Sequence, residues 1–292
     1  MYVIFGATGK IGRATIHELR DRGAPVRAVV RDRSTANELA MLGCDVAIAD
    51  LLDTAAISRA IDGATAVQVI CPTDPTDADP SSTMDRLIDS ISRALTTALP
   101  PAVLAISDYG AHLDAGTGIT LAFHRLERRL RQLPTALTLV RSAAHMQNFA
   151  RVLGAVADTG VFPSFHLPLT QPFITVSAPD VGIATADLLL APAPSASPRV
   201  VHVEGPRRYT AEDVASTLSV VLGRDVVARG VPRVDWIPAL GRGGMSPAYA
   251  QLIAETLDAE NAGRIDVDPT DGFICRGTTE LGDVFESLVP AR

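Results

Sequence analysis

The sequence predicts an α/β fold built on a doubly wound parallel sheet. Over the first 140 residues, short apolar runs rich in β-branched residues alternate with longer amphipathic stretches, as in consecutive β-α-β units. Glycine or paired proline follows several of the amphipathic stretches, as expected at helix ends. With 292 residues, of which 47% are hydrophobic, the chain is long enough to bury a large core.

Six strands and five helices are expected in this first part. The strands are Tyr2–Phe5, Val26–Val30, Asp45–Ile48, Ala66–Ile70, Val103–Ile106 and Ala136–Val140. The helices are Ile11–Arg22, Ser34–Leu42, Thr54–Ile61, Ser82–Leu99 and Leu121–Gln132. Gly23 and Gly43 follow the first two helices, Thr54 is a candidate cap of the third, and Pro100-Pro101 ends the fourth.

After Arg141 the regular alternation stops, and a proline- and phenylalanine-rich segment reads as a lid or crossover. The strands expected next are Phe173–Val176, Val200–Val203 and Val226–Val231. The helices expected are 180–190, one that begins at a candidate capping box of Thr210 and Asp213 and ends at Leu222, and Pro247–Asn261. A Pro/Ala/Ser linker is expected over 191–198. We expect a first domain over 1–150, and a lid and smaller C-terminal α/β domain over 151–292. Packing of 173–190 against the first domain is an open alternative.

The charge and the terminal sequence exclude several classes of function. A net charge of −7 gives no basic surface for nucleic acid. No apolar run approaches the roughly 20 residues that span a bilayer. Met1 leads into an apolar strand without a basic segment and cleavage site, so a cytoplasmic location is expected.

The cysteines, histidines and lysine of the chain limit which metal sites and catalytic mechanisms are expected. The three cysteines are far apart and the six histidines show no metal-ligand spacing, so we expect no metal. Lys10 is the only lysine among 26 basic residues, and mechanisms that need a second lysine are excluded.

A glycine-rich turn joins the first strand to the first helix. Gly6, Gly9 and Gly12 stand in the segment Gly6-Ala7-Thr8-Gly9-Lys10-Ile11-Gly12. In this setting glycines let backbone N–H groups approach a pyrophosphate, although a tight turn without a ligand would need them too. The position favours a dinucleotide site of the Rossmann type that includes Thr8, Lys10 and Ile11.

The residues after the second strand bear on the choice of dinucleotide. An acidic residue there favours NAD(H), and an arginine accommodates the 2′-phosphate of NADP(H). Arg31 comes first and Arg33 is close, so NADP(H) is favoured, while Asp32 keeps NAD(H) possible. Asp50 and Leu51 end the third strand, where Asp50 would accept from the adenine amino group or would only cap the next turn.

The chain resembles the NmrA-like family of atypical short-chain dehydrogenases. The resemblance rests on the glycine turn, on Val26–Asp32, on the segment Phe173-Ile174-Thr175-Val176-Ser177-Ala178-Pro179-Asp180-Val181-Gly182 and on Glu204-Gly205-Pro206, and it covers essentially the entire chain. It implies an NADP-preferring domain and a C-terminal domain that completes a substrate cleft. It also implies either reduction of quinone- or dye-like acceptors or a non-catalytic redox-sensing role.

The same resemblance implies a nicotinamide and acceptor pocket at the carboxyl ends of later strands. Its residues would be Cys71, Thr73, Ser107, Tyr109, His145, Met146 and Asn148, with Phe165 from the lid. The candidates for catalysis are Tyr109 and His124. Tyr109 and His145 are read at least as readily as packed residues with a satisfied polar tip, and the safer reading of His124 is a helix histidine with a solvent-facing tip.

The acid–base pair of short-chain dehydrogenases is missing. Leu113 stands four residues after Tyr109, where Tyr-x-x-x-Lys would place lysine. A quinone or azo dye accepts hydride without a tuned acid–base, whereas an alcohol or ketone needs one. We therefore expect an NADPH-dependent reductase of a small conjugated acceptor, monomeric or homodimeric. The alternative is a regulator that binds NADP(H) and acts on a protein partner; a nucleotide-sugar epimerase is disfavoured.

Overall fold

A computed structural model of the chain describes residues 1–192, 194, 197–268 and 270–289. The strands of its central sheet are β1 (Tyr2–Ile4), β2 (Val26–Val30), β3 (Asp45–Ile48), β4 (Ala66–Ile70), β5 (Ala102–Asp108), β6 (Ala136–Ser142), β10 (Arg199–Glu204) and β12 (Phe273–Arg276). They run in the order β12-β10-β6-β5-β4-β1-β2-β3 as an eight-stranded sheet in which all neighbours are parallel. The expected α/β fold with a doubly wound sheet is confirmed.

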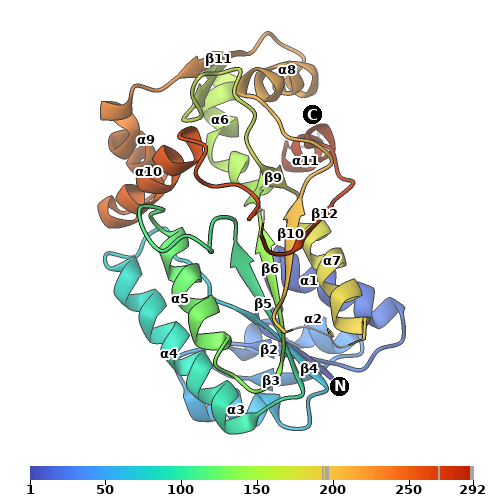
Figure 1. Cartoon of the computed structure of the whole chain (residues 1–292). Coiled ribbons are helices and arrows are strands. Elements are labelled where there is room, and N and C mark those ends of the chain that lie inside the picture. Colours follow the sequence, from blue (N-terminus) through green and yellow to red (C-terminus); the bar gives the residue numbers. More distant parts are fainter. Residues whose placement is uncertain (193, 195–196, 269, 290–292) are drawn as a thin grey trace.

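Helices cover both faces of this sheet (Figure 1). One face carries α3 (Thr54–Ile61), α4 (Pro80–Ala98) and α5 (Thr120–Leu130), and the other carries α1 (Lys10–Asp21), α2 (Ala36–Met41) and α7 (Ala178–Leu190). Because side chains alternate along a strand, Val103 and Ala105 of β5 join the first core and Leu104 and Ile106 join the second. This two-sided burial explains why the strands read as continuous apolar runs.

Helix α7 packs closely on α1, although almost 160 residues separate them in the sequence. A β-carbon on Gly182 would stand 2.5 Å from both the Ala14 side chain and the Ile11 carbonyl oxygen. The Thr15 hydroxyl also donates to the Gly182 carbonyl at 3.2 Å. Helix α7 is therefore held directly against α1.

A smaller group of elements lies beyond the carboxyl ends of β5, β6 and β10 (Figure 1). One cluster joins the short 3-10 helix Met146–Phe149, α6 (Ala150–Thr159), β8 (Val161–Ser164), α8 (Ala211–Leu222), β11 (Val227–Gly230) and α11 (Leu281–Leu288). A second joins α9 (Trp236–Arg242) to α10 (Pro247–Asn261), after the turn Arg233–Asp235. Strands β8 and β11 pair with each other, as do β7 (Ala144–His145) and β9 (Thr175–Val176). These elements cover the edge at which ligands of open α/β sheets bind.

Two strands of the C-terminal half belong to the central sheet. Val200–Val203 was expected in the small C-terminal section, but β10 pairs with β6, with Val201 opposite Val140. Strand β12, which was not expected, adds the outer edge. The placement of Val200–Val203 was therefore wrong, while the domain division at residue 150 stays a prediction.

Several local expectations can be compared with the observed helix ends. Asp53, rather than Thr54, caps α3, because its Oδ1 accepts from the Ala56 amide at 3.0 Å. The capping box of Thr210 and Asp213 is present. Of the expected linker, Ala193, Ser195 and Ala196 lie outside the described residues.

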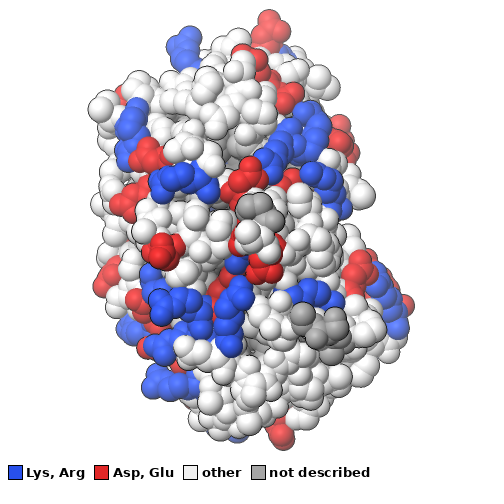
Figure 2. Space-filling model, in the orientation of Figure 1, with Lys and Arg blue, Asp and Glu red and all other residues white. Residues whose placement is uncertain are grey.

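The described surface carries charges of both signs. On the face shown in Figure 2, basic and acidic side chains are interspersed. Two exposed pairs bridge α4 and α5, Asp85 with Arg125 at 2.6 Å and Asp89 with Arg129 at 3.0 Å. Among the described helices, none is long and apolar enough to cross a membrane.

Candidate functional site

The turn between β1 and α1 is closely packed on its own backbone. Gly6 has φ +72°, and the Gly9 amide donates to the Gly6 carbonyl oxygen at 2.9 Å. A β-carbon on Gly12 would stand 2.2 Å from the same oxygen. The first and third glycines are therefore required by the turn itself.

The start of α1 presents unpaired backbone donors. Gly9 is the N-cap and supplies no side-chain cap, and Thr8, Gly9 and Lys10 are exposed while Ile11 is buried. The first N–H groups of a helix have no partner within the helix, and the helix dipole adds positive potential there. This end of α1 can accept a phosphate group.

Two arginines after β2 have no hydrogen-bond or ion-pair partner in the described part of the chain. Arg31 and Arg33 are exposed, and neither makes a side-chain hydrogen bond or ion pair with any described residue. Asp32 is engaged locally instead, since it accepts from the Ser34 amide at 2.9 Å and from the Ser34 hydroxyl. These hydrogen bonds lower the pKa of Asp32. Two guanidinium groups are thus free beside the glycine turn.

Side chains at the ends of β3 and β4 contact other groups of the protein. Asp50 Oδ1 accepts from the Leu52 amide at 2.8 Å, so it caps the turn, and Leu51 packs partly buried on the core. Burial raises the pKa of the Cys71 thiol to about 12 and leaves it unreactive. Thr73 is exposed, and its hydroxyl lies 3.1 Å from the Tyr249 hydroxyl of α10.

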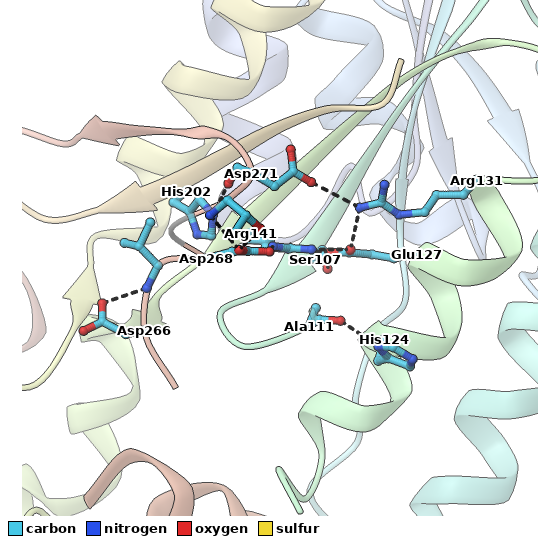
Figure 3. A network of polar contacts seen from close by, with 12 residues as sticks. Ser107, Ala111, His124, Glu127, Arg131, Arg141, His202, Asp266, Asp268 and Asp271 are labelled. Carbon is cyan, nitrogen blue, oxygen red and sulfur yellow. Dashed lines mark hydrogen bonds and ion pairs between the residues drawn. The ribbon is translucent and has the colours of Figure 1, made fainter. Parts of the chain in front are cut away.

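Ser107 near the end of β5 belongs to a buried ion-pair network (Figure 3). Its hydroxyl donates to Glu127 Oε1 at 2.7 Å, and Arg141 donates to both oxygens of Glu127, at 3.0 and 2.8 Å. Asp268 lies 3.7 Å from Arg141 on the opposite side. The Ser107 side chain is therefore committed to the contact between β5, β6 and α5.

Tyr109 and His124, the two candidates for catalysis, are both engaged with protein groups. The Tyr109 side chain is 3% exposed and donates to Glu204 Oε1 at 2.9 Å. Burial and the Glu204 carboxylate raise the pKa of Tyr109 far above its usual range. His124 Nδ1 donates to the Ala111 carbonyl oxygen at 2.9 Å, which fastens the loop after β5 (Figure 3). Neither contact requires a ligand.

His145 lies where the glycine turn and the end of β6 approach each other. Burial, with a smaller effect of the Lys10 ammonium, lowers the pKa of His145 to about 4, so its ring is neutral at pH 7. The Ser142 hydroxyl donates to the Ala143 carbonyl and lies 3.2 Å from His145 Nε2. This pattern places a proton on Nε2 and leaves Nδ1 as a free acceptor.

The remaining pocket candidates differ in exposure. Met146 is fully buried and Asn148 is exposed. Phe165 is half-buried, with its ring edge-on to Trp236 at a centroid distance of 5.9 Å. Asn148 and Phe165 therefore retain surface for contact with a ligand, and Met146 supports the site from beneath.

A comparison with known families agrees with this arrangement. Residues 2–272 match the family model described as the NmrA-like family. The chain belongs to the NmrA-like family. The resemblance inferred from the glycine turn and the later segments is thereby confirmed.

Curated relatives of this NmrA-like chain include two bacterial reductases. It is 26% identical to an NAD(P)H azoreductase of Xenophilus azovorans over 77% of this chain and 75% of the relative. It is 24% identical to quinone oxidoreductase 2 of Escherichia coli (strain K12) over 99% and 98% of the two chains.

Solved structures share its fold along the whole chain. NADPH-dependent quinone oxidoreductase QOR2 of Escherichia coli, complexed with NADPH, has a TM-score of 0.81 at 21% identity, covering 99% of this chain and 98% of that one. The triphenylmethane reductase of Citrobacter sp., complexed with NADP(H), also has a TM-score of 0.81, at 20% identity and coverage of 99% and 100%.

Two further carboxyl groups lie at the covered edge of the sheet. Asp108 is the last residue of β5, and its Oδ2 accepts from the Thr120 hydroxyl at 2.7 Å. Glu260 lies in the last turn of α10, with its carboxylate 3.8 Å from His166 Nδ1. Asp108 belongs to the strand end, Ser107-Asp108-Tyr109, that the family resemblance implies for the pocket, whereas no local pattern marks Glu260.

Among the described residues, no group of three or more histidine, cysteine, aspartate or glutamate side chains is arranged to hold a metal ion.

Proposed function

We propose that this NmrA-like chain is an NADP(H)-dependent oxidoreductase that transfers hydride to a small conjugated acceptor such as a quinone or azo dye. The observation that carries the proposal is the pairing of an uncapped helix start at Gly9 with two unpaired guanidinium groups at Arg31 and Arg33. The names of the curated relatives, an azoreductase and a quinone oxidoreductase, support the reaction class.

The described residues fit NADP(H). Backbone N–H groups of Thr8–Gly12 would hold the pyrophosphate, with Lys10 as a second positive group. Arg31 and Arg33 would bind the 2′-phosphate, because Asp32 is already occupied by Ser34. The bound dinucleotide would supply the hydride. His145 Nδ1 and Thr73 would contact its nicotinamide end at the carboxyl ends of β6 and β4.

The acceptor class follows from the absence of a tyrosine–lysine pair. Tyr109 is directed to Glu204, and Lys10, the only lysine of the chain, is on the glycine turn. We therefore assign Tyr109 and His124 structural roles, and likewise Ser107. An electron-poor quinone or dye accepts hydride without strong acid catalysis, whereas oxidation of an alcohol would require a positioned base.

The acceptor would lie between residues 1–150 and the later elements. Asn148 and Phe165 retain exposed surface on that side, and Met146 and Phe173 support them from the buried cluster. Largely apolar walls with a few polar groups suit a flat conjugated ring.

Turnover assays distinguish this function from a regulatory one. Purified protein should oxidise NADPH in the presence of simple quinones and an azo dye and should leave secondary alcohols with NADP⁺ unchanged. Tight NADPH binding without turnover on any acceptor would favour the regulator. Turnover of alcohols would contradict the proposed acceptor class.

A further inference from the structure

The loop that follows β4 is fastened to the start of α10. Ser246, the N-cap of α10, donates from its amide to the Pro75 carbonyl oxygen at 2.8 Å and from its hydroxyl to the Asp77 carbonyl oxygen. In the first turn of the same helix, the Tyr249 hydroxyl donates to Thr73 Oγ1 at 3.1 Å. Three hydrogen bonds therefore join two segments that are far apart in the sequence.

The same loop is also ordered by hydrogen bonds within itself. Asp74 Oδ1 accepts from the Thr76 amide at 2.8 Å and from the Thr76 hydroxyl at 2.7 Å. Asp77 Oδ1 accepts from the Asp79 amide at 2.8 Å. Such side-chain turns fix the backbone that they span. The position of Thr73 is therefore set by the whole loop and by α10 together.

Tyr249 leaves the Thr73 hydroxyl with a hydrogen to donate. The Tyr249 side chain is buried in the cluster that also holds Cys71 and Met84, so the place of its hydroxyl is fixed. The Tyr249 hydroxyl uses its one hydrogen on Thr73 Oγ1. Thr73 is exposed, and no other described residue makes a hydrogen bond with its hydroxyl. The Thr73 O–H can therefore donate to a ligand.

The end of β4 lies on the nicotinamide side of the glycine turn. The order of neighbouring strands is β4-β1-β2, so β4 and Arg31, which follows β2, are on opposite sides of β1. A β-carbon on Gly6 would stand 2.8 Å from Cγ2 of Ile70, the last residue of β4. With the 2′-phosphate at Arg31 and the pyrophosphate at the turn, the other end of the dinucleotide extends over β4. Thr73 follows Ile70 by three residues at this edge.

We propose that Tyr249 is a positioning residue of the NADP(H) site, which holds the Thr73 hydroxyl as a hydrogen-bond donor to the carboxamide oxygen of the nicotinamide. The inference rests on the proposed function, because it takes NADP(H) as the ligand. Tyr249 acts through Thr73 and contacts no part of the cofactor itself. A hydroxyl that accepts from a phenol is a stronger donor, since successive hydrogen bonds polarise one another. The contact fixes the rotation of the nicotinamide ring.

Equilibrium binding of whole cofactor and of a fragment tests this role. Tyr249→Phe removes one hydroxyl and should raise the Kd for NADPH by about threefold to tenfold. The Kd for adenosine 2′,5′-bisphosphate, which lacks the nicotinamide, should not change. Thr73→Val should show the same pattern, whereas Thr73→Ser keeps a hydroxyl and should bind NADPH nearly as wild type. An equal loss of affinity for both ligands would mean that Tyr249 only supports the fold, and would overturn the proposal.

A double variant tests whether Tyr249 acts through Thr73. Adding Tyr249→Phe to Thr73→Val should weaken NADPH binding no further than Thr73→Val alone, because the two residues share one contact. Losses that multiply would contradict the positioning role. Tyr209→Phe is the matched control, because Tyr209 is also buried but its hydroxyl donates to Glu280 at 2.7 Å in the smaller group of elements. The control should bind both ligands as wild type does.

The outcomes separate this inference from the function on which it rests. Thr73 is exposed, so its variants carry the test even where Tyr249→Phe fails to fold. A wild-type protein that binds both ligands, with NADPH affinity unchanged by Thr73→Val, would overturn the positioning role alone. A folded wild-type protein that binds neither NADPH nor adenosine 2′,5′-bisphosphate would overturn the proposed function and the positioning role together.

Discussion

The Tyr109 hydroxyl donates to Glu204 Oε1 over 2.9 Å, which joins the end of β5 to the end of β10. Glu204 also accepts from Arg208 at 3.0 Å and from Arg276 at 2.9 Å, so its carboxylate is held by three donors. The tyrosine that follows β5 is therefore part of the contact between the two strand ends, with its hydroxyl hydrogen directed to Glu204.

Tyr109→Phe is expected to leave turnover nearly unchanged and to reduce stability. Removing a hydrogen bond to a charged acceptor costs about 1.5–3 kcal/mol, and two arginines still neutralise Glu204, which favours the lower value. Urea unfolding and kcat for a quinone, measured on the same preparations, check this. A kcat lowered about 10²-fold with unchanged stability would instead identify Tyr109 as an acid catalyst.

The pair of Glu127 and Arg141 is expected to dominate the stability of the β5–β6–α5 contact. Glu127→Ala leaves the Arg141 guanidinium, which is 1% exposed, without its main partner. The free energy of unfolding should fall by about 3–5 kcal/mol, or somewhat less if Asp268 moves closer. Asp89→Ala, which breaks the exposed pair with Arg129 between α4 and α5, is the control and should cost less than about 1 kcal/mol.

The pair of Glu127 and Arg141 also predicts how the stability of the protein changes with pH. Burial alone would raise the pKa of Glu127, but the Arg141 guanidinium outweighs it and lowers the pKa below the ordinary 4.5. The stability from this group is complete above 4.5 and is lost as the pH falls through the lowered pKa. The difference between wild type and Glu127→Ala in urea unfolding should therefore shrink in acid; a constant difference from pH 7 to pH 3 would refute the assignment.

Arg31→Ala is expected to weaken NADPH binding by about tenfold or more and to leave NADH binding unchanged, because a charge-assisted contact to the 2′-phosphate is lost. Titration by nicotinamide fluorescence measures both affinities. Arg128→Ala, an exposed arginine on α5 away from the glycine turn, is the control. Equal losses for the two dinucleotides would place Arg31 on another part of the cofactor.

Gly9→Val is expected to abolish cofactor binding in a folded protein. Gly9 has φ −76°, which any residue adopts, and a β-carbon there would stand 3.3 Å from the Gly6 carbonyl oxygen, so the change requires only a small shift of the turn. The branched side chain would occupy the space in front of the helix start. Gly241→Ala, where a β-carbon meets nothing within 4 Å, is the control. Thermal unfolding and NADPH titration together check the result; unchanged affinity would mean that Gly9 serves only the turn.

Much of the fold follows from local patterns, because a parallel strand buried on both faces is a short apolar run and its helix has recognisable ends. The third helix was expected over Thr54–Ile61 and lies there. Strand β10 was misplaced because its partner β6 is about 60 residues away, and nothing in Val200–Val203 indicates which sheet receives it. Pairing across such a distance depends on how the intervening chain folds.

The candidate site shows where sequence reasoning reaches its limit. Two neighbouring residues at the end of β5 are both bonded to α5, since the Ser107 hydroxyl donates to Glu127 and the Asp108 carboxylate accepts from Thr120. A strand-end argument identifies the segment but cannot tell which of its side chains meets a ligand. The glycine turn was easier to interpret, because its chemistry lies in backbone groups and one short segment.

A single-turnover experiment tests the central claim most directly. Wild-type protein loaded with one equivalent of NADPH and mixed anaerobically with excess quinone should form one hydroquinone for each NADPH, within the time of one catalytic cycle. We expect this stoichiometry for NADPH and a much slower reaction with NADH at equal concentration. NADPH that stays bound and unoxidised across quinones and azo dyes would contradict the claim that this NmrA-like chain is a reductase.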